Sequence, residues 1–387
     1  MTATLRLKRG HDRARAHPWI FKGDVADVGD VAPGDAVAVV DSAGRFVGRG
    51  FFNPRPALCC RILTRRDEPI DRAFFEHRVR EAIAFRDGRA GSGPLRLIWS
   101  EGDGLPGLVV DRYGDVLAVQ CLTLGMARAR AEIVAALRTA LGDRPVFNAD
   151  DPVAAGLEGF TPARGWIDRP GPESVVVDED GVKLRVTLGG GHKTGLYLDQ
   201  RENHRRVAEV AAGHHVLDAF AYSAAFACHA LVRGARDAVC IESSPEALAA
   251  ARENLALNGV ARRAELVAGN VFDELRALER DGRRFGLVVL DPPPFARSRT
   301  AVGAAARGYK EINLRALRLL EPGGHLATFS CSHHVAEATF EEICRAAATD
   351  AGVTARVVDR LTQASDHPVL LTVPETRYLK GLLLEIV

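Results

Sequence analysis

Short apolar runs alternate with helical stretches from Ser174 to the carboxyl end of this 387-residue chain, and this alternation constrains the fold more than any other feature. Runs rich in valine, leucine and isoleucine are typical of strands that are buried on both faces of a sheet. The predicted strands cover residues 216–220, 238–242, 264–268, 287–290, 325–329, 353–361 and 379–386. Because helical stretches separate most of them, we predict an α/β fold with a doubly wound, mostly parallel sheet of seven strands.

Two smaller regions precede this sheet. Short alternating runs separated by Pro-Gly and Ala-Gly turn signals predict a small β domain over residues 1–68. Predicted helices mixed with a strand pair suggest an α+β central domain over residues 69–170. A Pro- and Gly-rich stretch near residues 164–172 is the expected linker to the sheet domain over residues 171–387.

The composition narrows the class of protein. Hydrophobic residues make up 47% and charged residues 26%, which is typical of a globular chain. No apolar stretch reaches the roughly 18 residues of a membrane span, and the amino terminus lacks the apolar core of a signal peptide. Seven cysteines without a Cys-x-x-Cys motif fit neither a disulfide framework nor a zinc site. We therefore expect a reduced, cytoplasmic protein without a metal.

Charge is distributed unevenly along the chain. Residues 1–66 hold twelve Lys and Arg against six Asp and no Glu, a net charge of +6, so the remaining chain carries −5 of the total +1. A basic first domain on a near-neutral protein hints at a polyanionic partner. A solvated basic surface is the alternative.

Polar side chains follow three successive predicted strands, where a parallel sheet binds ligands. An acid at the tip of the second strand, about twenty residues after the first turn, is typical of ribose binding, and an amide after the third could read an adenine amino group. We expect this crevice to be lined by Asp218, Phe220, Tyr222, Ser223, Glu242, Ser243, Asn270 and Val271. The chain lacks a Gly-x-Gly-x-x-Gly or Walker motif, which disfavours a pyrophosphate cofactor and leaves S-adenosylmethionine compatible. These residues could instead only cap the following helices.

Two further strand ends carry reactive groups. Asp291 and Pro292 end the fourth strand, and Cys331 follows the fifth. A thiolate that adds to carbon 6 of cytosine makes carbon 5 nucleophilic, and a carboxylic acid bonded to ring nitrogen 3 stabilises the charge that develops. A helix amino terminus near Val335, or the adjacent histidines, could activate the thiol. The alternatives are a turn after a buried strand and a small buried cysteine.

A polar loop precedes the first strand of the sheet. Its composition suggests that it closes over the methionine end of a ligand, although a simple helix start capped by Asp199 remains open. The residues expected to contact the cofactor here are Lys193, Thr194, Gly195, Asp199, Gln200 and Arg201.

These motifs together resemble a known family. They are His17-Pro18-Trp19-Ile20-Phe21, Glu101-Gly102-Asp103-Gly104-Leu105-Pro106-Gly107-Leu108, Lys193-Thr194-Gly195, Leu198-Asp199-Gln200-Arg201, Asp291-Pro292-Pro293, Arg307-Gly308-Tyr309-Lys310, Phe329-Ser330-Cys331-Ser332, Asp366-His367-Pro368 and Tyr378-Leu379-Lys380-Gly381. Over nearly its whole length, the chain resembles the class I S-adenosylmethionine-dependent methyltransferases that modify carbon 5 of cytosine in large-subunit ribosomal RNA.

The resemblance implies a set of roles. Cys331 would be the nucleophile, Asp291 its partner, and Asp218, Glu242 and Asn270 would line the cofactor site. A PUA-like first domain would hold ribosomal RNA, and the target base would flip into the crevice. A homodimer is one expected assembly, although the sequence itself does not determine the oligomeric state.

The chain departs from the family pattern near the cofactor. The family usually has Gly-Gly at Ala224-Ala225, where an added methyl group can clash with a ligand or forbid a positive φ, and it usually has Asp at Asn270. A Lys is common at Pro294, and the central domain's usual basic pair is replaced around residues 151–155. Two alternatives follow: methylation of a base nitrogen with Cys331 structural, or a catalytically silent RNA-binding protein.

Overall fold

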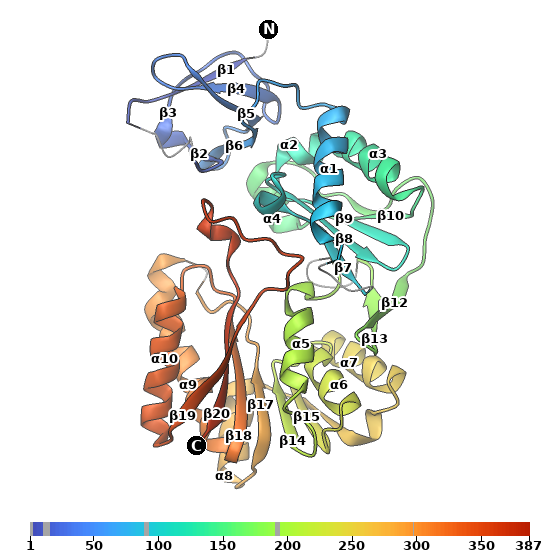
Figure 1. The fold of residues 1–387 in the computed structure, drawn as a ribbon, viewed down its shortest axis with the longest axis vertical. Coiled ribbons are helices and arrows are strands. Elements are labelled where there is room, and N and C mark those ends of the chain that lie inside the picture. The colour runs from blue at the N-terminus through green and yellow to red at the C-terminus, as the bar shows by residue number, and fades with distance from the viewer. Residues whose placement is uncertain (1–2, 11–15, 89–92, 190–193, 297) are drawn as a thin grey trace. The chain divides into compact units, whose positions relative to one another are not determined.

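The computed structural model describes residues 3–10, 16–88, 93–189, 194–296 and 298–387 (Figure 1). Its contacts divide the chain into two compact units, which are described separately. Unit 1 contains Met1–Val177, Val186–Leu198 and Ser365–Arg377, and unit 2 contains Asp178–Arg185, Asp199–Ala364 and Tyr378–Val387. Within the described ranges, no helix is both long and apolar enough to cross a membrane.

Unit 1 begins with a six-stranded sheet in the order β2-β6-β5-β4-β1-β3. Its strands are β1 (Thr4–Leu7), β2 (Trp19–Phe21), β3 (Val25–Val28), β4 (Ala36–Val40), β5 (Phe46–Phe52) and β6 (Leu58–Thr64). On β4 the side chains alternate between buried and half-buried positions, as in a sheet with one face on a core. Val37 and Val39 accordingly join Leu5, Leu7 and Ile20 in that core.

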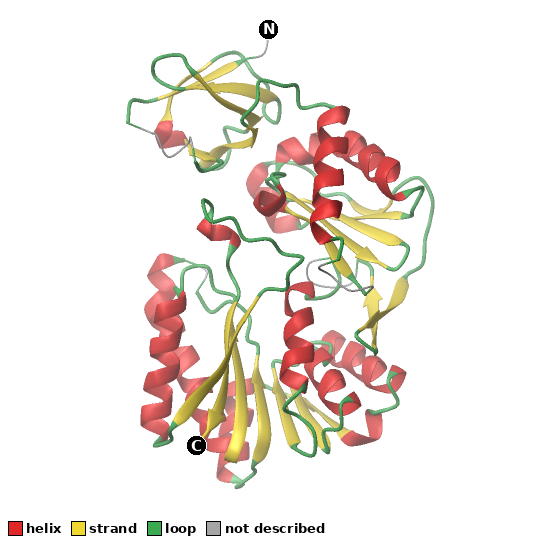
Figure 2. Cartoon of the chain, in the orientation of Figure 1, coloured by secondary structure: helices red, strands yellow, loops and turns green. Residues whose placement is uncertain are grey.

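A second sheet of unit 1 has five strands in the order β11-β10-β9-β8-β7 (Figure 2). The elements of this part are α1 (Arg72–Arg86), β7 (Leu95–Trp99), β8 (Leu108–Tyr113), β9 (Val116–Cys121), α2 (Leu124–Arg128), α3 (Arg130–Leu141), β10 (Val146–Ala149), α4 (Pro152–Glu158) and β11 (Arg164–Trp166). Helix α1 begins after Asp71, whose carboxylate accepts the Phe74 amide hydrogen and so caps the helix. A hairpin of β12 (Ser174–Glu179) and β13 (Val182–Thr187) follows.

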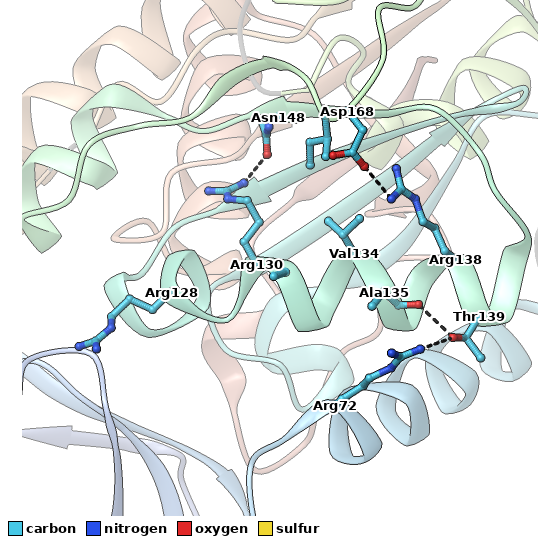
Figure 3. A pocket seen from close by; sticks show the side chains of 11 residues that line it. Arg72, Arg128, Arg130, Val134, Ala135, Arg138, Thr139, Asn148 and Asp168 are labelled. Carbon is cyan, nitrogen blue, oxygen red and sulfur yellow. Dashed lines mark hydrogen bonds and ion pairs between the residues drawn. The ribbon is translucent and has the colours of Figure 1, made fainter.

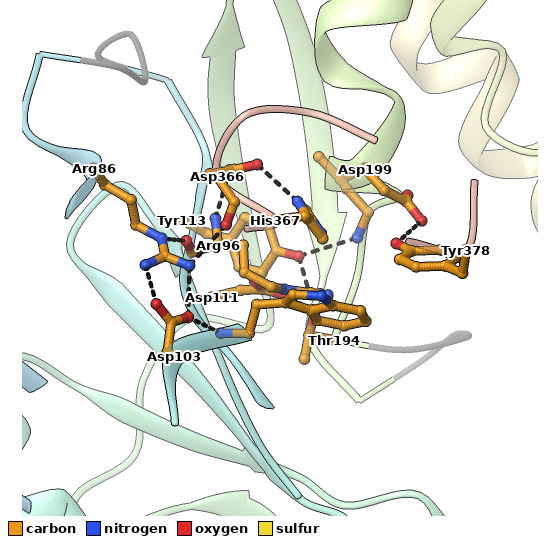
Figure 4. Close-up of polar contacts among 12 residues, drawn as sticks. Arg86, Arg96, Asp103, Asp111, Tyr113, Thr194, Asp199, Asp366, His367 and Tyr378 are labelled. Carbon is orange, nitrogen blue, oxygen red and sulfur yellow. Dashed lines mark hydrogen bonds and ion pairs between the residues drawn. The ribbon is translucent and has the colours of Figure 1, made fainter. Parts of the chain in front are cut away.

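Two buried ion pairs tie distant segments of unit 1 together (Figure 4). Arg86 binds Asp103 and Arg96 binds Asp111, each through two guanidinium nitrogens. Arg86 also donates to the Asp366 carbonyl oxygen at 2.7 Å, and the Arg96 amide donates to the Asp366 carboxylate at 2.9 Å. Residues 365–377 therefore belong to unit 1 because buried hydrogen bonds hold them there.

Unit 2 is built on a seven-stranded sheet in the order β16-β15-β14-β17-β18-β20-β19. The strands are β14 (His215–Ala219), β15 (Asp237–Glu242), β16 (Ala264–Ala268), β17 (Phe285–Leu290), β18 (Leu320–Ser330), β19 (Ala355–Thr362) and β20 (Lys380–Ile386). Only β20 runs antiparallel to its neighbours, so the predicted doubly wound, mostly parallel sheet is confirmed. Every residue of β17 is buried, which explains its unbroken apolar sequence.

Helices cover both faces of this sheet (Figure 1). They are α5 (Arg201–Ala208), α6 (Ala225–Val232), α7 (Pro245–Leu257), α8 (Val271–Arg280), α9 (Val302–Leu319) and α10 (Glu337–Ala351). The strand order reverses between β14 and β17, and such a reversal opens a crevice at the carboxyl ends of the strands. The boundaries predicted for the three domains remain predictions.

Candidate functional site

Three acidic side chains meet where the strand order of unit 2 reverses. Asp218 lies on β14, Glu242 ends β15 and Asp291 follows β17 directly. Burial, reinforced by the negative charges of Asp291 and Glu242, raises the pKa of Asp218 to about 7. The three carboxyl groups therefore contribute to one negative electrostatic potential, which suits a ligand that carries a positive charge.

The loop after β14 has an unusual backbone. Phe220, Tyr222 and Ala224 all adopt a positive φ, of 65°, 48° and 58°. The Tyr222 amide donates to Glu242 Oε2 at 3.0 Å, which fastens this loop to the end of β15. Ala224 is fully buried, so its methyl group points into the protein, and its positive φ is adopted rather than forbidden. The departure from glycine thus produces backbone strain at a buried position.

Glu242 and Asn270 both use part of their hydrogen-bonding capacity on the backbone. Glu242 Oε1 accepts the amide hydrogens of Ser243 and Ser244, at 2.7 and 2.9 Å. Oε1 also accepts the Ser243 hydroxyl hydrogen at 3.3 Å, so the acceptor capacity that remains for a ribose hydroxyl lies on Oε2, which accepts the Tyr222 amide hydrogen. Asn270 Oδ1 caps α8 by accepting the Phe272 amide hydrogen at 2.9 Å. The amide hydrogens of Asn270 can then face a ligand. Because they are donors, they match a ring nitrogen of adenine better than they match the amino group of adenine.

Cys331 lies beside the turn that contains Asp291. Its Sγ is 3.8 Å from the carbonyl oxygen of Pro292, and the Ala296 amide donates to Ser332 Oγ at 3.3 Å. Cys331 is half-buried, whereas the other six cysteines are buried. The structure thus brings together the two strand ends that the sequence singles out.

A buried tyrosine holds both neighbours of Cys331. The Tyr309 hydroxyl on α9 is 2.9 Å from Ser332 Oγ and accepts a hydrogen bond from Ser330 Oγ at 3.0 Å. Both serine side chains are fully buried. The sequence singles out Tyr309 only as part of a motif, without a role, because a hydroxyl between two serines cannot be recognised before α9 and β18 are packed together.

Aromatic rings extend from this tyrosine across the crevice. Ring centroids lie 4.6 Å apart for Phe295 and Tyr309, 5.9 Å for Phe272 and Phe295, and 6.2 Å for Phe220 and Phe295. Phe220, Phe272 and Phe295 are half-buried, so parts of their surfaces remain accessible. Such surfaces suit planar heterocycles.

The segment before α5 is also buried. The Tyr378 hydroxyl donates to Asp199 Oδ2 at 2.5 Å (Figure 4), and Asn203 Nδ2 donates to Gln200 Oε1 at 2.6 Å. Arg201 is 5% exposed. Among the described residues, Gln200 Nε2 and Asn203 Oδ1 are buried without a hydrogen-bond partner, which fits a site that a polar ligand completes.

Three expected cofactor contacts are not part of the described residues of unit 2. Thr194 and Gly195 belong to unit 1, where the Thr194 hydroxyl bonds Tyr113 at 3.1 Å and the Asp111 carboxylate. Lys193 lies outside the described residues. Their part in cofactor binding stays a prediction.

A buried cluster of unit 2 has the composition of a metal site. Glu179 Oε1 lies 2.6 Å from His204 Nδ1 and 3.0 Å from His229 Nε2. Burial opposes the charge of Glu179, but the two histidines hold its pKa at about 2. Arg233 lies 2.8 Å from His229 Nδ1, and because a guanidinium can only donate, the proton of His229 sits on Nε2, facing Glu179. A metal would need a lone pair there, so we interpret the cluster as a buried carboxylate–histidine pair in which His204 makes the hydrogen bond to Glu179.

Unit 1 contains a pocket of about 970 Å³ against α3 (Figure 3). Each of its four arginines already has a polar partner: Arg72 binds Glu76, Arg128 binds Asp35, Arg130 binds Asp150 and Arg138 binds Asp168. The pocket therefore offers little net positive charge for an anion, and it lies in a different unit from the acidic crevice.

Comparison with known proteins reveals clear relatives. A family described as S-adenosylmethionine-dependent methyltransferase matches residues 158–384, and one described as a PUA-like domain matches residues 4–65. Proteins named ribosomal RNA large subunit methyltransferase I from Salmonella arizonae and Klebsiella pneumoniae are each 39% identical over 384 residues. These matches cover 97% of this chain and 95% and 96% of the relatives.

Solved structures share the fold. A methyltransferase complexed with SAH superposes with a TM-score of 0.86 at 20% identity, with all of both chains covered. A methyltransferase from Streptococcus mutans gives a TM-score of 0.85 at the same identity and coverage.

Proposed function

We propose that this chain, which belongs to the ribosomal RNA large subunit methyltransferase I family of S-adenosylmethionine-dependent methyltransferases, methylates carbon 5 of a cytosine in large-subunit ribosomal RNA. The reaction would proceed through a covalent bond between Cys331 and the base. One observation carries this proposal: the half-buried Cys331 thiol lies 3.8 Å from the carbonyl oxygen of Pro292, directly after Asp291. A thiol and a carboxyl-bearing residue thus follow two neighbouring strands at the same edge of the sheet.

The chemistry assigns different tasks to the two groups. The Cys331 thiolate adds to carbon 6 of the cytosine ring, which makes carbon 5 nucleophilic. S-adenosylmethionine supplies, when bound, the methyl group that carbon 5 receives. A base then takes the proton from carbon 5, and the thiolate leaves carbon 6, which restores the double bond and the free Cys331. Asp291, once protonated, would donate a hydrogen bond to ring nitrogen 3, where negative charge develops during the addition.

The crevice fits the cofactor in charge and in the types of residue that line it. The shared field of Asp218, Glu242 and Asp291 favours a positively charged sulfonium group. Glu242 would bind the ribose hydroxyls, and Asn270 and Val271 would face the adenine. The buried Gln200 amide hydrogens would bind the methionine end. The other residues of unit 2 proposed to line the cofactor site are Asp199, Arg201, Phe220, Tyr222, Ser223, Ser243 and Pro292. A cofactor role for Lys193, Thr194 and Gly195 rests on the sequence alone.

Ribosomal RNA is the substrate that the relatives' names indicate. Residues 4–65, which match the PUA-like family, lie within residues 1–66, whose net charge is +6. That charge favours contact with phosphates. The target cytosine would leave its stack to reach Cys331 between the aromatic rings of the crevice.

A trapping experiment tests the proposal. RNA that contains 5-fluorocytosine cannot lose a proton from carbon 5, so the adduct with Cys331 should persist and migrate as a stable protein–RNA complex. We expect the complex with the unmodified protein and with Cys344→Ala, a buried-cysteine control, and none with Cys331→Ala. If Cys331→Ala keeps its activity, the covalent mechanism is wrong, and mass spectrometry of the product nucleoside then shows whether a base nitrogen carries the methyl group.

A further inference from the structure

We propose that Lys380 is a positioning residue that orders the Cys331 loop and favours the thiolate form of Cys331; this inference rests on the proposed function. Lys380 is the first residue of β20, which lies between β18 and β19 in the sheet. The strand register places it opposite Ser330 on one side and Thr362 on the other. Its backbone is therefore fixed beside the residue that precedes Cys331.

The Lys380 side chain reaches the turn that follows Cys331. Its ammonium donates to the carbonyl oxygens of Ser332 and Val335, both at 2.7 Å, and the residue is only 8% exposed. The Val335 amide also donates to the Ser332 carbonyl oxygen, at 3.1 Å, which closes the turn. Burying a lysine is unfavourable unless its charge is compensated, so this contact is a specific feature of the loop.

Positive charge near a cysteine favours its reactive, ionised form. The titratable groups around the loop are Asp291 after β17, Tyr309 on α9, His333 and His334 within the loop, Glu337 at the start of α10, Asp199 before α5, and Tyr378 and Lys380 at β20. Among these, Lys380 is the buried cation, whereas His333 and His334 are exposed and Glu337 opposes thiolate formation. Lys380 therefore supplies the activating charge that the sequence suggested for the histidines or a helix start.

The effect of Lys380 on ionisation of the Cys331 thiol can be measured without RNA or methyl transfer. Cys331 is alkylated with iodoacetamide across a pH series, and mass spectrometry of its peptide gives the extent of reaction. Lys380→Gln keeps amide donors but removes the charge, and Lys380→Arg keeps the charge. We expect the pH midpoint of alkylation to rise by about one unit in Lys380→Gln and to stay unchanged in Lys380→Arg. Lys183→Gln, at an exposed position of the same unit, is the matched control.

Methyl transfer provides the second readout. At pH 7 the activity of Lys380→Gln should fall about tenfold and recover as the pH rises, because thiolate forms again. The proposal would be overturned if Lys380→Gln lost the same fraction of activity at every pH or kept the alkylation midpoint of the unmodified protein. A raised alkylation midpoint in Lys380→Arg would also overturn it, and this test remains available even if Lys380→Gln fails to fold. If Cys331→Ala retained methylation while Lys380→Gln still shifted alkylation, the covalent mechanism would fail, and only the effect of Lys380 on the Cys331 thiolate would stand, without a role in catalysis.

Discussion

Backbone strain at Ala224 illustrates what a single residue contributes to this site. A left-handed conformation costs an alanine roughly 1 kcal/mol more than it costs a glycine. Three residues with a positive φ within five positions shape the loop that connects β14 to α6. Strain of this kind persists only where surrounding contacts impose it, and here the Tyr222–Glu242 hydrogen bond is one of them.

Replacing Ala224 by glycine should therefore stabilise the protein. We expect Ala224→Gly to raise the free energy of unfolding by about 0.5–1 kcal/mol, measured by urea denaturation. Ala225→Gly is the matched control, because Ala225 is the first residue of α6 and glycine is unfavourable in a helix. If both substitutions change stability in the same direction, the strain argument is incorrect.

Asp218 provides a second prediction at the residue scale. An unfolded aspartate titrates near pH 4, whereas burial raises the pKa of native Asp218 to about 7. Between these values the native state holds a proton that the unfolded state has released, so the contribution of Asp218 to stability falls as the pH rises. The slope is at most about 1.4 kcal/mol per pH unit.

Urea unfolding at pH 5, 6, 7 and 8 measures this dependence. Asp218→Asn should flatten the decline, while Asp281→Asn, at an exposed aspartate, should leave it unchanged. A cationic cofactor favours the ionised carboxylate, so S-adenosylmethionine affinity should rise between pH 6 and 8 in the unmodified protein. Calorimetric titration that finds the same rise in Asp218→Asn would contradict this assignment.

Packing between α9 and β18 decides the geometry of the reacting loop at the element scale. Ser330 and Ser332 flank Cys331, and both bond the Tyr309 hydroxyl. A helix that moved along the sheet would break both bonds together. The Cys331 loop is thus oriented from the α9 side by Tyr309 and from the β20 side by Lys380.

Removing the Tyr309 hydroxyl should leave two buried serine hydroxyls with fewer partners. We expect Tyr309→Phe to lower the free energy of unfolding by about 1–3 kcal/mol and to reduce methyl transfer. Combining it with Ser330→Ala should cost less than the sum of the single changes, because both substitutions remove the same hydrogen bond. Strict additivity in this double-mutant cycle would show that Tyr309 and Ser330 act independently.

Charge is segregated over the molecule as a whole. Residues 1–66 carry a net charge of +6, and the remaining chain −5. Binding of phosphates releases counterions, so RNA affinity should fall steeply as salt increases. The exposed basic residues of the first segment, including Arg6, Lys8 and Arg9, are the groups that we expect to bind phosphates.

Replacing Arg6, Lys8 and Arg9 by alanine should weaken RNA binding and lower the slope of log affinity against log salt by about one for each phosphate that the protein no longer neutralises. Filter binding across a salt series measures both quantities. Alanine at Arg252, Arg280 and Arg345, three exposed arginines of unit 2, removes the same charge and should change the slope less. Equal slopes for the two triple variants would argue against RNA binding by the first segment.

The sequence by itself determined the sheet and its two reactive strand ends. Periodicity and strand length are local properties, so the runs at 264–268 and 287–290 could be assigned before any tertiary contact was known. The motif resemblance likewise identified the family and the cofactor, which the comparisons confirm. The catalytic and cofactor roles of individual residues remain predictions.

Tertiary structure alone decided how those residues are held. Three features depend on how distant parts of the chain pack together. They are the burial of the Ala224 methyl group, the position of the Tyr309 hydroxyl between two serines, and the contact of the Lys380 ammonium with the Cys331 loop. Hydrogen bonds between distant segments leave no periodic signal in a sequence, because they depend on packing and strand register rather than on local spacing. The sequence therefore located the groups that we propose to react, whereas the fold determined how they are held and their electrostatic surroundings.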